Sequence, residues 1–186
     1  MTVVKDLELI RKWLQREVCN KFEFKRPPDN EDADAEEYEC DYVHPVAFVM
    51  YPPLDKRFPS VVIQFGEGEE NRGEERGELN IKLLFATWNP GLHYIDEGNV
   101  PNFEANHEGW QDVWNFIDLT LRTIRNSDII GGSIRIKHES GIRYGPMKEQ
   151  DVAANYYPHW CGWITFTIQY GVTSINLLED DISSLI

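Results

Sequence analysis

The segment Trp160–Tyr170 limits the possible folds of this chain most strongly, because its side chains alternate in character at every second residue. Four large apolar residues share one side of the alternation: Ile164, Phe166, Ile168 and Tyr170. The other side is half polar: Trp163, Thr165, Thr167 and Gln169. An extended strand separates two such sets onto opposite faces, whereas a helix would mix them. The segment therefore predicts a long strand in a sheet with one buried face.

Further strands are predicted upstream of this segment. Pro59–Phe65 and Leu79–Phe85 also alternate, and Ser133–His138 does so over a shorter length. The apolar run His44–Tyr51 is followed by two prolines, which fits a short or edge strand because proline cannot donate a hydrogen bond to a sheet. Gly66–Glu78 is rich in glycine and charge, so we expect a long hairpin loop that stands off the sheet.

Two segments have the apolar spacing of amphipathic helices. The first spans Val3–Val18, and the second spans Trp110–Ile124 with Asn106 as its expected N-cap. Their tryptophans are expected to pack in the core: Trp13, Trp110 and Trp114. The order of elements predicts an α+β fold with an antiparallel sheet of about four to five strands, two helices packed on one face, a long hairpin and long loops.

The length of 186 residues suits a single α+β domain, which we place at 1–186. Residues 29–41 are crowded with carboxylates, so we expect a flexible acidic insertion there. The tail at 175–186 mixes acidic and apolar residues and fits either a short docking segment or a mobile end. Trp88–Asn106 contains prolines, glycines and asparagines and predicts an irregular connection of unusual length.

The formal net charge of −14 argues against tight binding to nucleic acid, because phosphate backbones are bound by lysine and arginine. Cys19, Cys40 and Cys161 are widely spaced and predict reduced thiols, with neither a disulfide framework nor a zinc ribbon. The N-terminal segment lacks an apolar signal core, and no stretch is apolar for long enough to form a spanning helix. We expect a soluble protein made in the cytoplasm, with no membrane partner.

The residue types that usually carry catalysis or hold metals are not spaced for either task. Carboxylates stand beside His93, His107 and His138, but none of these histidines belongs to a motif that places several ligands together. His159 and Cys161 lie close in sequence without a third group to orient them, which argues against a nucleophilic pair. We therefore predict no catalytic residue, no metal, no cofactor and no enzyme activity.

Three stretches of the chain carry a family resemblance: VVIQFGEGEE, the helix GWQDVWNFIDLTLRTIRN, and Tyr156–Trp163 followed by ITFTIQY. Together they resemble the tail terminator proteins of long-tailed phages and related prophage tails, over Pro59–Gly171. The resemblance implies a structural virion protein, a subunit of a hexameric ring that ends elongation of the tail tube and provides the head-docking surface. It also implies a location in the virion tail, after assembly in the host cytoplasm.

The partners that the resemblance implies are further copies of the chain, the tail tube protein and head-tail connector proteins. DNA would pass through the channel without specific binding, which an acidic wall permits. Two alternatives remain open at this point. One is another tail or neck component, such as a tube protein or a head-tail connector, and the other is a non-catalytic protein-binding module.

A ring of identical subunits needs a heterologous interface, in which two different faces meet. The tip of the predicted hairpin is a candidate for one face, with a free loop as the alternative: Glu69, Glu70, Arg72, Glu74, Glu75 and Arg76. Candidate contacts to other partners gather before the last strand: Tyr156, Tyr157, His159, Trp160 and Trp163. Aromatic side chains with one polar handle often serve interfaces, although core packing remains an equal alternative for Trp88, Trp160 and Trp163.

Overall fold

A computed structural model describes residues 3–27, 40–52, 59–71, 73, 75–98, 101–154 and 156–171. The tail at 175–186 and most of the predicted acidic insertion at 29–41 lie outside these residues, as do Arg72 and Glu74 of the predicted interface. In these ranges the chain forms one main sheet, two α-helices and three small two-stranded sheets.

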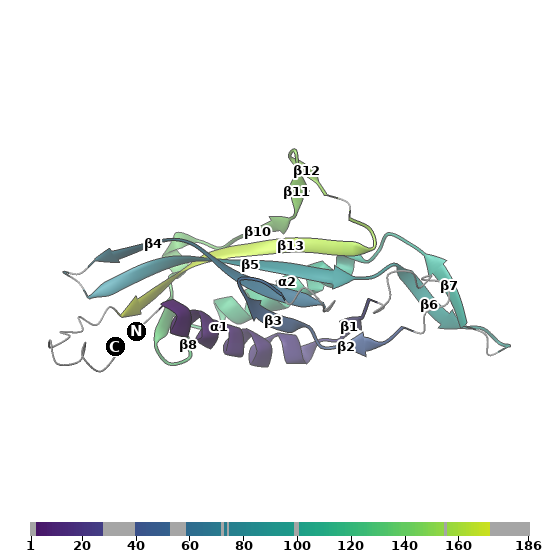
Figure 1. Cartoon of the computed structure of the whole chain (residues 1–186), viewed down its shortest axis with the longest axis horizontal. Coiled ribbons are helices and arrows are strands. Elements are labelled where there is room, and N and C mark those ends of the chain that lie inside the picture. The colour runs from purple at the N-terminus through teal and green to yellow at the C-terminus, as the bar shows by residue number, and fades with distance from the viewer. Residues whose placement is uncertain are drawn as a thin grey trace, which may run out of the picture.

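The main sheet has seven strands. Six follow the spatial order β3 (Val46–Val49), β4 (Ser60–Asn71), β5 (Arg76–Trp88), β13 (His159–Gly171), β9 (Ile134–Ile136) and β8 (Ile129–Ile130). The seventh, β10 (Arg143–Pro146), pairs with β13. β3 and β4 run parallel, and the other neighbours are antiparallel. The long strands β5 and β13 pair along their whole length at the centre of the sheet (Figure 1).

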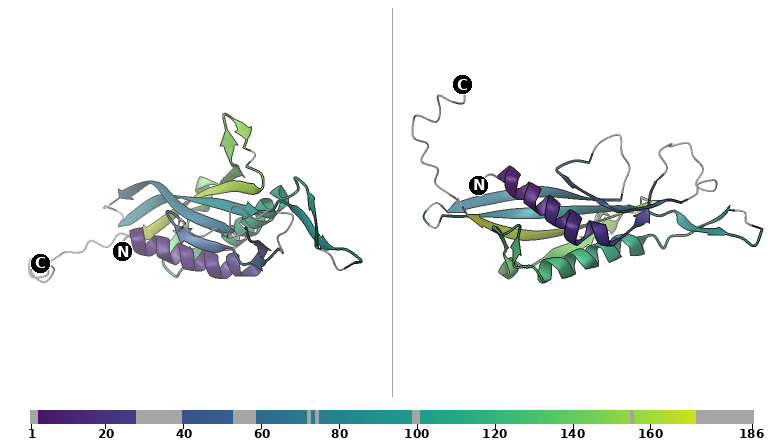
Figure 2. Two further views of the ribbon diagram at one scale, coloured as in Figure 1. Left: turned by 45° about the vertical axis from the view of Figure 1, so that its right-hand side comes forward. Right: turned by 90° about the horizontal axis from the view of Figure 1, so that it is seen from below.

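The core lies between this sheet and the helices α1 (Val3–Glu17) and α2 (Trp110–Arg125). α1 packs chiefly against β3, and α2 packs against β13 and β5. Figure 2, right, shows both helices in front of the strands when the molecule is seen from below. The predicted core face of β13 is confirmed, since its four apolar side chains are buried: Ile164, Phe166, Ile168 and Tyr170. Phe85 and Phe116 join sheet to helix edge to face, with ring centroids 4.9 Å apart.

The predicted antiparallel sheet of about four to five strands with two helices packed on one face is wrong. The observed sheet has seven strands, is mixed, and curls. β8 and β10 are too short to show alternation in the sequence. Nothing local in the sequence sets the parallel direction of β3 beside β4, because pairing partners are chosen by long-range burial. Strand twist and a bulge between Phe65 and Gly68 contribute to the curl.

β4 extends to Asn71 and β5 begins at Arg76, so most of the charged stretch Gly66–Glu78 is strand, and the predicted long loop is wrong for those residues. Their backbone pairing extends to Asn71 opposite Arg76. The side chains of β4 beyond Gln64 are exposed to solvent. Charged residues are therefore compatible with this part of the strand, because their side chains remain in water.

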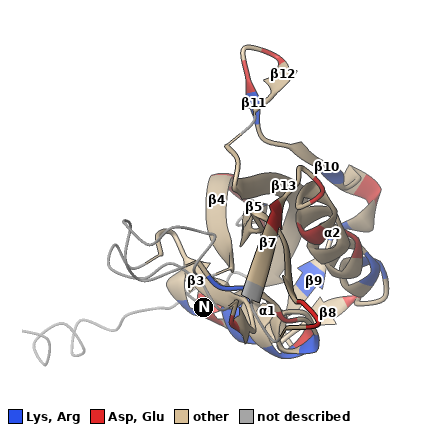
Figure 3. Cartoon of the chain, turned by 90° about the vertical axis from the view of Figure 1, so that its right-hand side faces the viewer, with Lys and Arg blue, Asp and Glu red and all other residues tan. Residues whose placement is uncertain are grey.

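Three small sheets accompany the main one. β1 (Phe24–Lys25) pairs with β2 (Tyr42–Val43), β6 (Gly91–Ile95) with β7 (Pro101–Ala105), and β11 (Lys148–Glu149) with β12 (Val152–Ala153). The predicted irregular connection Trp88–Asn106 is therefore mostly a hairpin, which we call the β6–β7 arm. The arm extends from one end of the molecule, and β11 and β12 stand away from the sheet (Figures 1 and 3). Two short 3₁₀ helices are also described, η1 (Cys19–Lys21) and η2 (His138–Ser140).

Both α-helices form where the apolar spacing predicts them, but two details differ. Gly109 is the N-cap of α2, and Asn106 instead accepts a hydrogen bond from the Glu108 amide at 3.1 Å through its side-chain oxygen. Trp110 is 49% exposed, so its predicted burial is wrong. It occupies the first position of α2, at the end of the apolar stripe, where the core no longer covers it.

Candidate interaction surfaces

The Tyr156–Trp163 segment lies at the base of the β6–β7 arm, and two of its predicted contact residues fasten the arm to the body. The Tyr157 hydroxyl donates to the carbonyl oxygen of Pro90 at 2.6 Å. The indole nitrogen of Trp160 donates to the carbonyl oxygen of Asn89 at 3.0 Å. The two rings meet edge to face with centroids 6.4 Å apart. Tyr157 and Trp160 therefore have an internal structural role, whatever else they contact.

The other predicted contact residues occupy two places. Tyr156 and His159 are exposed and form an isolated bridge beside the arm base. Trp163 is half-buried on the face of β13 that points away from the core, which we call the outer face, and its indole nitrogen donates to the carbonyl oxygen of Pro146 at 3.0 Å. Trp88 is only 5% exposed and packs inside the protein.

A polar network around the buried Lys25 lies at the same base and has no counterpart in the sequence predictions. Lys25, only 7% exposed, donates to the side-chain oxygen of Asn89 at 3.1 Å and to the carbonyl oxygen of Gly91. The Asn89 amide donates in turn to Asp112 at 2.7 Å. Burial lowers the pKa of Lys25 and raises the pKa of Asp112. Because a buried polar group is costly without partners, the bonds of Lys25 to Asn89 and Gly91 stabilise the base of the arm.

The β6–β7 arm itself presents apolar side chains to solvent. Leu92, Tyr94 and Ile95 are 52%, 47% and 67% exposed. His93 and Phe103 contact each other across the arm, with ring centroids 4.9 Å apart. Side chains alternate along a strand, so Leu92 and Tyr94 lie on one face of the arm and Ile95 on the other. An isolated two-stranded ribbon is marginally stable in water, and exposed apolar residues on both faces favour contact with another protein. The arm is therefore a candidate docking element.

The described members of the predicted oligomer interface lie at the far end of the β4–β5 hairpin. Glu69, Glu70 and Glu75 are exposed there, and we call these three residues the acidic end. Arg76 is exposed beside them. Glu69 lies directly opposite Glu78 in the strand register, and facing like charges destabilise a strand pair.

Glu78 is compensated by other residues, whereas the acidic end is not. The Lys137 ammonium lies 2.6 Å from the Glu78 carboxylate, and Gln169 donates to the same carboxylate at 2.9 Å. The hydrogen bond from Lys137 holds the pKa of Glu78 below its usual value. In the described part of the chain, Glu69 and Glu75 form no ion pair, and Glu70 meets only the Tyr170 hydroxyl, at 3.5 Å.

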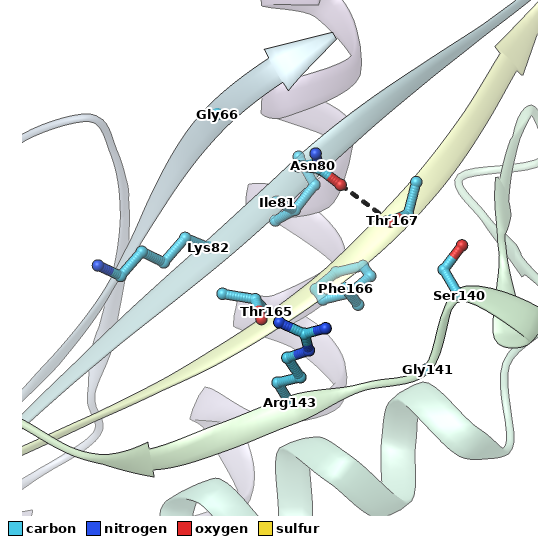
Figure 4. A pocket seen from close by; sticks show the side chains of 10 residues that line it. All are labelled: Gly66, Asn80, Ile81, Lys82, Ser140, Gly141, Arg143, Thr165, Phe166 and Thr167. Carbon is cyan, nitrogen blue, oxygen red and sulfur yellow. Dashed lines mark hydrogen bonds between the residues drawn. The ribbon is translucent and has the colours of Figure 1, made fainter. Parts of the chain in front are cut away.

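The outer face of the sheet carries a polar row that crosses three strands. Lys82 of β5, Thr165 of β13 and Arg143 of β10 are consecutive register partners, so their side chains share a face. With neighbouring residues they line a hollow of about 440 Å³, which we call the basic hollow. Figure 4 shows Arg143 on one side of Thr165 and Lys82 on the other side of Thr165. The Thr167 hydroxyl donates a hydrogen bond to the side-chain oxygen of Asn80 at 3.0 Å. Neither Lys82 nor Arg143 forms an ion pair with any residue that the structure describes.

Groups suited to catalysis or metal binding are dispersed. Within the described ranges, no three histidine, cysteine, aspartate or glutamate side chains come together as a metal site. Burial raises the pKa of the Cys19 thiol to about 12 and also raises the pKa of Cys161. A thiol whose pKa is raised in this way is a poor nucleophile at neutral pH.

Neither described helix has the length and apolar character needed to cross a membrane. Comparisons of the chain with protein-family models, with curated proteins and with solved structures find no match.

Proposed function

We propose that the chain is a structural assembly protein of a phage tail: a tail terminator that forms a ring on the tail tube, ends its elongation and provides the head-docking surface. The family resemblance over Pro59–Gly171 supports this proposal from the sequence. Its partners are then further copies of the chain, the tail tube protein and head-tail connector proteins. DNA passes the acidic wall without specific binding, and the protein has no catalytic role.

The observation that carries the proposal is the β6–β7 arm. A network of the buried Lys25 with the partly buried Asn89 and Asp112 lies at its base, while Leu92 and Ile95 are exposed along its length. An arm that is held at its base and apolar beyond it is organised to reach another protein, since fixing it in advance lowers the entropy cost of docking. A subunit that joins others in a ring, and then tube and head components, needs such a projecting contact.

The decisive experiment is electron microscopy of tails made by a phage or prophage whose gene for this chain is interrupted. Overlong tails are expected, because tube growth then lacks its stop. Tails of normal length overturn the terminator assignment. Finished tails of normal length without heads would favour the head-tail connector instead.

Complementation with arm variants tests whether the arm carries this function. A chain with Leu92→Ser, Tyr94→Ser and Ile95→Ser is expected to fold and to leave tails overlong, because the apolar contacts are lost. The matched control carries Val4→Ser and Ile129→Ser, which are 76% and 56% exposed elsewhere on the protein, and should restore normal length. Normal tails with the arm variant contradict the arm's role.

A further inference from the structure

The basic hollow and the acidic end are two uncompensated, oppositely charged surfaces on one chain. The chain carries 32 acidic and 18 basic side chains. Despite this excess of carboxylates, Lys82 and Arg143 have no acidic partner within the described residues. The glutamates of the acidic end likewise have no cation paired with them there.

Among the described residues, the acidic end forms no ion pair with the basic hollow of its own chain. Glu69 pairs in register with Glu78, which precedes Lys82 by four residues on β5. At about 3.3 Å per residue, the two side chains start about 13 Å apart along the sheet, because the register of the hairpin fixes this spacing. Both belong to one continuous hairpin, so no loop movement brings them together.

We propose that the basic hollow receives the acidic end of a second copy of this chain. Lys82 and Arg143 flank Thr165, so carboxylates entering the hollow meet two cations and a hydroxyl donor. The same contact gives Glu69 a cation, which it lacks among the described residues of its own chain. Because the two surfaces differ, the interface is heterologous and each copy can bind one neighbour on either side. This contact rests on the proposed ring function, for which it would form the interface between neighbouring subunits.

Charge reversal on each surface gives the test. The hollow variant carries Lys82→Glu and Arg143→Glu, and the acidic-end variant carries Glu69→Lys and Glu70→Lys. Sedimentation velocity at low ionic strength should show that the wild-type chain associates and that each variant alone associates at least about tenfold more weakly, because like charges then face each other. An equimolar mixture should regain association, since each variant offers the surface that the other one now fits.

The mixture also controls for folding, because a misfolded variant cannot be rescued by a second misfolded variant. Matched charge controls use exposed positions elsewhere: Lys12→Glu with Arg125→Glu, and Glu149→Lys with Asp151→Lys. Both controls should associate like the wild type. A wild-type chain that stays monomeric, variants that associate normally, or a mixture no better than its components each overturn the proposal.

This test is separable from the test of tail function. Association that survives both charge reversals excludes this interface and leaves the terminator assignment standing. Tails of normal length without the chain remove the terminator assignment, whereas a rescued mixture would still establish the contact between copies.

Discussion

Asn89 joins parts of the chain that lie far apart in the sequence. Its side chain accepts from Lys25 and from the Gly91 amide and donates to Asp112. Asn89→Ala should lower the free energy of unfolding by about 1–3 kcal/mol, because the buried Lys25 and the partly buried Asp112 each lose a hydrogen bond. Guanidinium denaturation measures the change.

Asn115→Ala is the matched control for this prediction, since Asn115 is exposed on α2. A surface substitution of this kind should change the free energy of unfolding by less than about 0.5 kcal/mol. Equal effects of the two substitutions would mean that the network at the arm base contributes nothing to stability.

Asp6 links stability to pH. Its side chain is 1% exposed, and both carboxylate oxygens lack a hydrogen-bond partner among the described residues. Burial raises its pKa above the ordinary value of 3.8, so its contribution to stability is fully present below that pH and falls as the pH rises through the folded-state pKa. Asp6→Asn should therefore gain stability relative to the wild type as the pH rises from 3.8 towards neutrality.

Denaturant midpoints of both proteins, compared across this pH range, test the prediction. Glu97→Gln at an exposed position controls for the loss of one negative charge. If the difference between Asp6→Asn and the wild type stays constant over the whole range, Asp6 does not titrate differently in the folded and unfolded states.

The sequence predicts buried side chains well where one face of an element is apolar, as for Ile164 and Phe166 on β13. It does not predict Lys25 or Asn89, because a single polar residue produces no periodic pattern and its partners lie far along the chain. The burial of Trp110 is predicted wrongly for the opposite reason. The apolar periodicity of α2 includes its first turn, but the core does not cover that turn.

The β6–β7 arm depends on a close approach of two backbones at Gly91. Gly91 has a φ of 148°, and an added Cβ would overlap the carbonyl oxygen of Glu104 and lie 2.8 Å from the Asn106 nitrogen. Gly91→Ala should cost about 1–3 kcal/mol through this strain. The arm should separate at its base and become sensitive to protease while the core remains folded.

Gly132→Ala, between β8 and β9, controls for the cost of alanine at a positive φ where there is no clash. Gly132 also has a positive φ, of 80°, but no heavy atom lies within 4 Å of the added Cβ. Protease sensitivity in the arm should therefore appear only for Gly91→Ala. If both variants are cleaved alike, close packing at Gly91 is not what holds the arm.

Elements were predictable where local pattern and tertiary environment agree. α2 and β13 satisfy both conditions, because each buries one face against the same core. The arm strands Gly91–Ile95 and Pro101–Ala105 lack apolar alternation, since neither face enters the core. The ends of β4 and β5 form strands because their backbones pair with each other. Their charged side chains favour a loop when the sequence is considered alone.

The β6–β7 arm and the far end of the β4–β5 hairpin, which carries the acidic end, lie at opposite ends of the long axis (Figure 1). The basic hollow is lined chiefly by residues of β5, β13 and β10. Such a distribution gives the protein unlike surfaces, as head-to-tail assembly requires. The sequence supplies the acidic end and the aromatic segment of this arrangement. The hollow depends on the register that brings Lys82, Thr165 and Arg143 into one row, and that register is a property of the folded sheet.

Hydrogen exchange should reveal this organisation as a gradient of stability. β5 is paired on both sides, by β4 and β13, so amides such as Ile81 and Leu83 should exchange most slowly. β11 and β12 share only two residue pairs, so Val152 and Ala153 should exchange fast. The arm should be intermediate, because its base is fixed while its far part is exposed.

Assembly should then change one part of this gradient selectively. If the arm docks on another protein, amides of Gly91–Ile95 exchange more slowly in assembled particles than in the dilute chain, because docking suppresses local opening. Amides of β5 serve as the internal control, since they are already protected by the core. Equal exchange of the arm in both samples would show that Leu92, Tyr94 and Ile95 stay uncovered, and the arm would then not be the docking element.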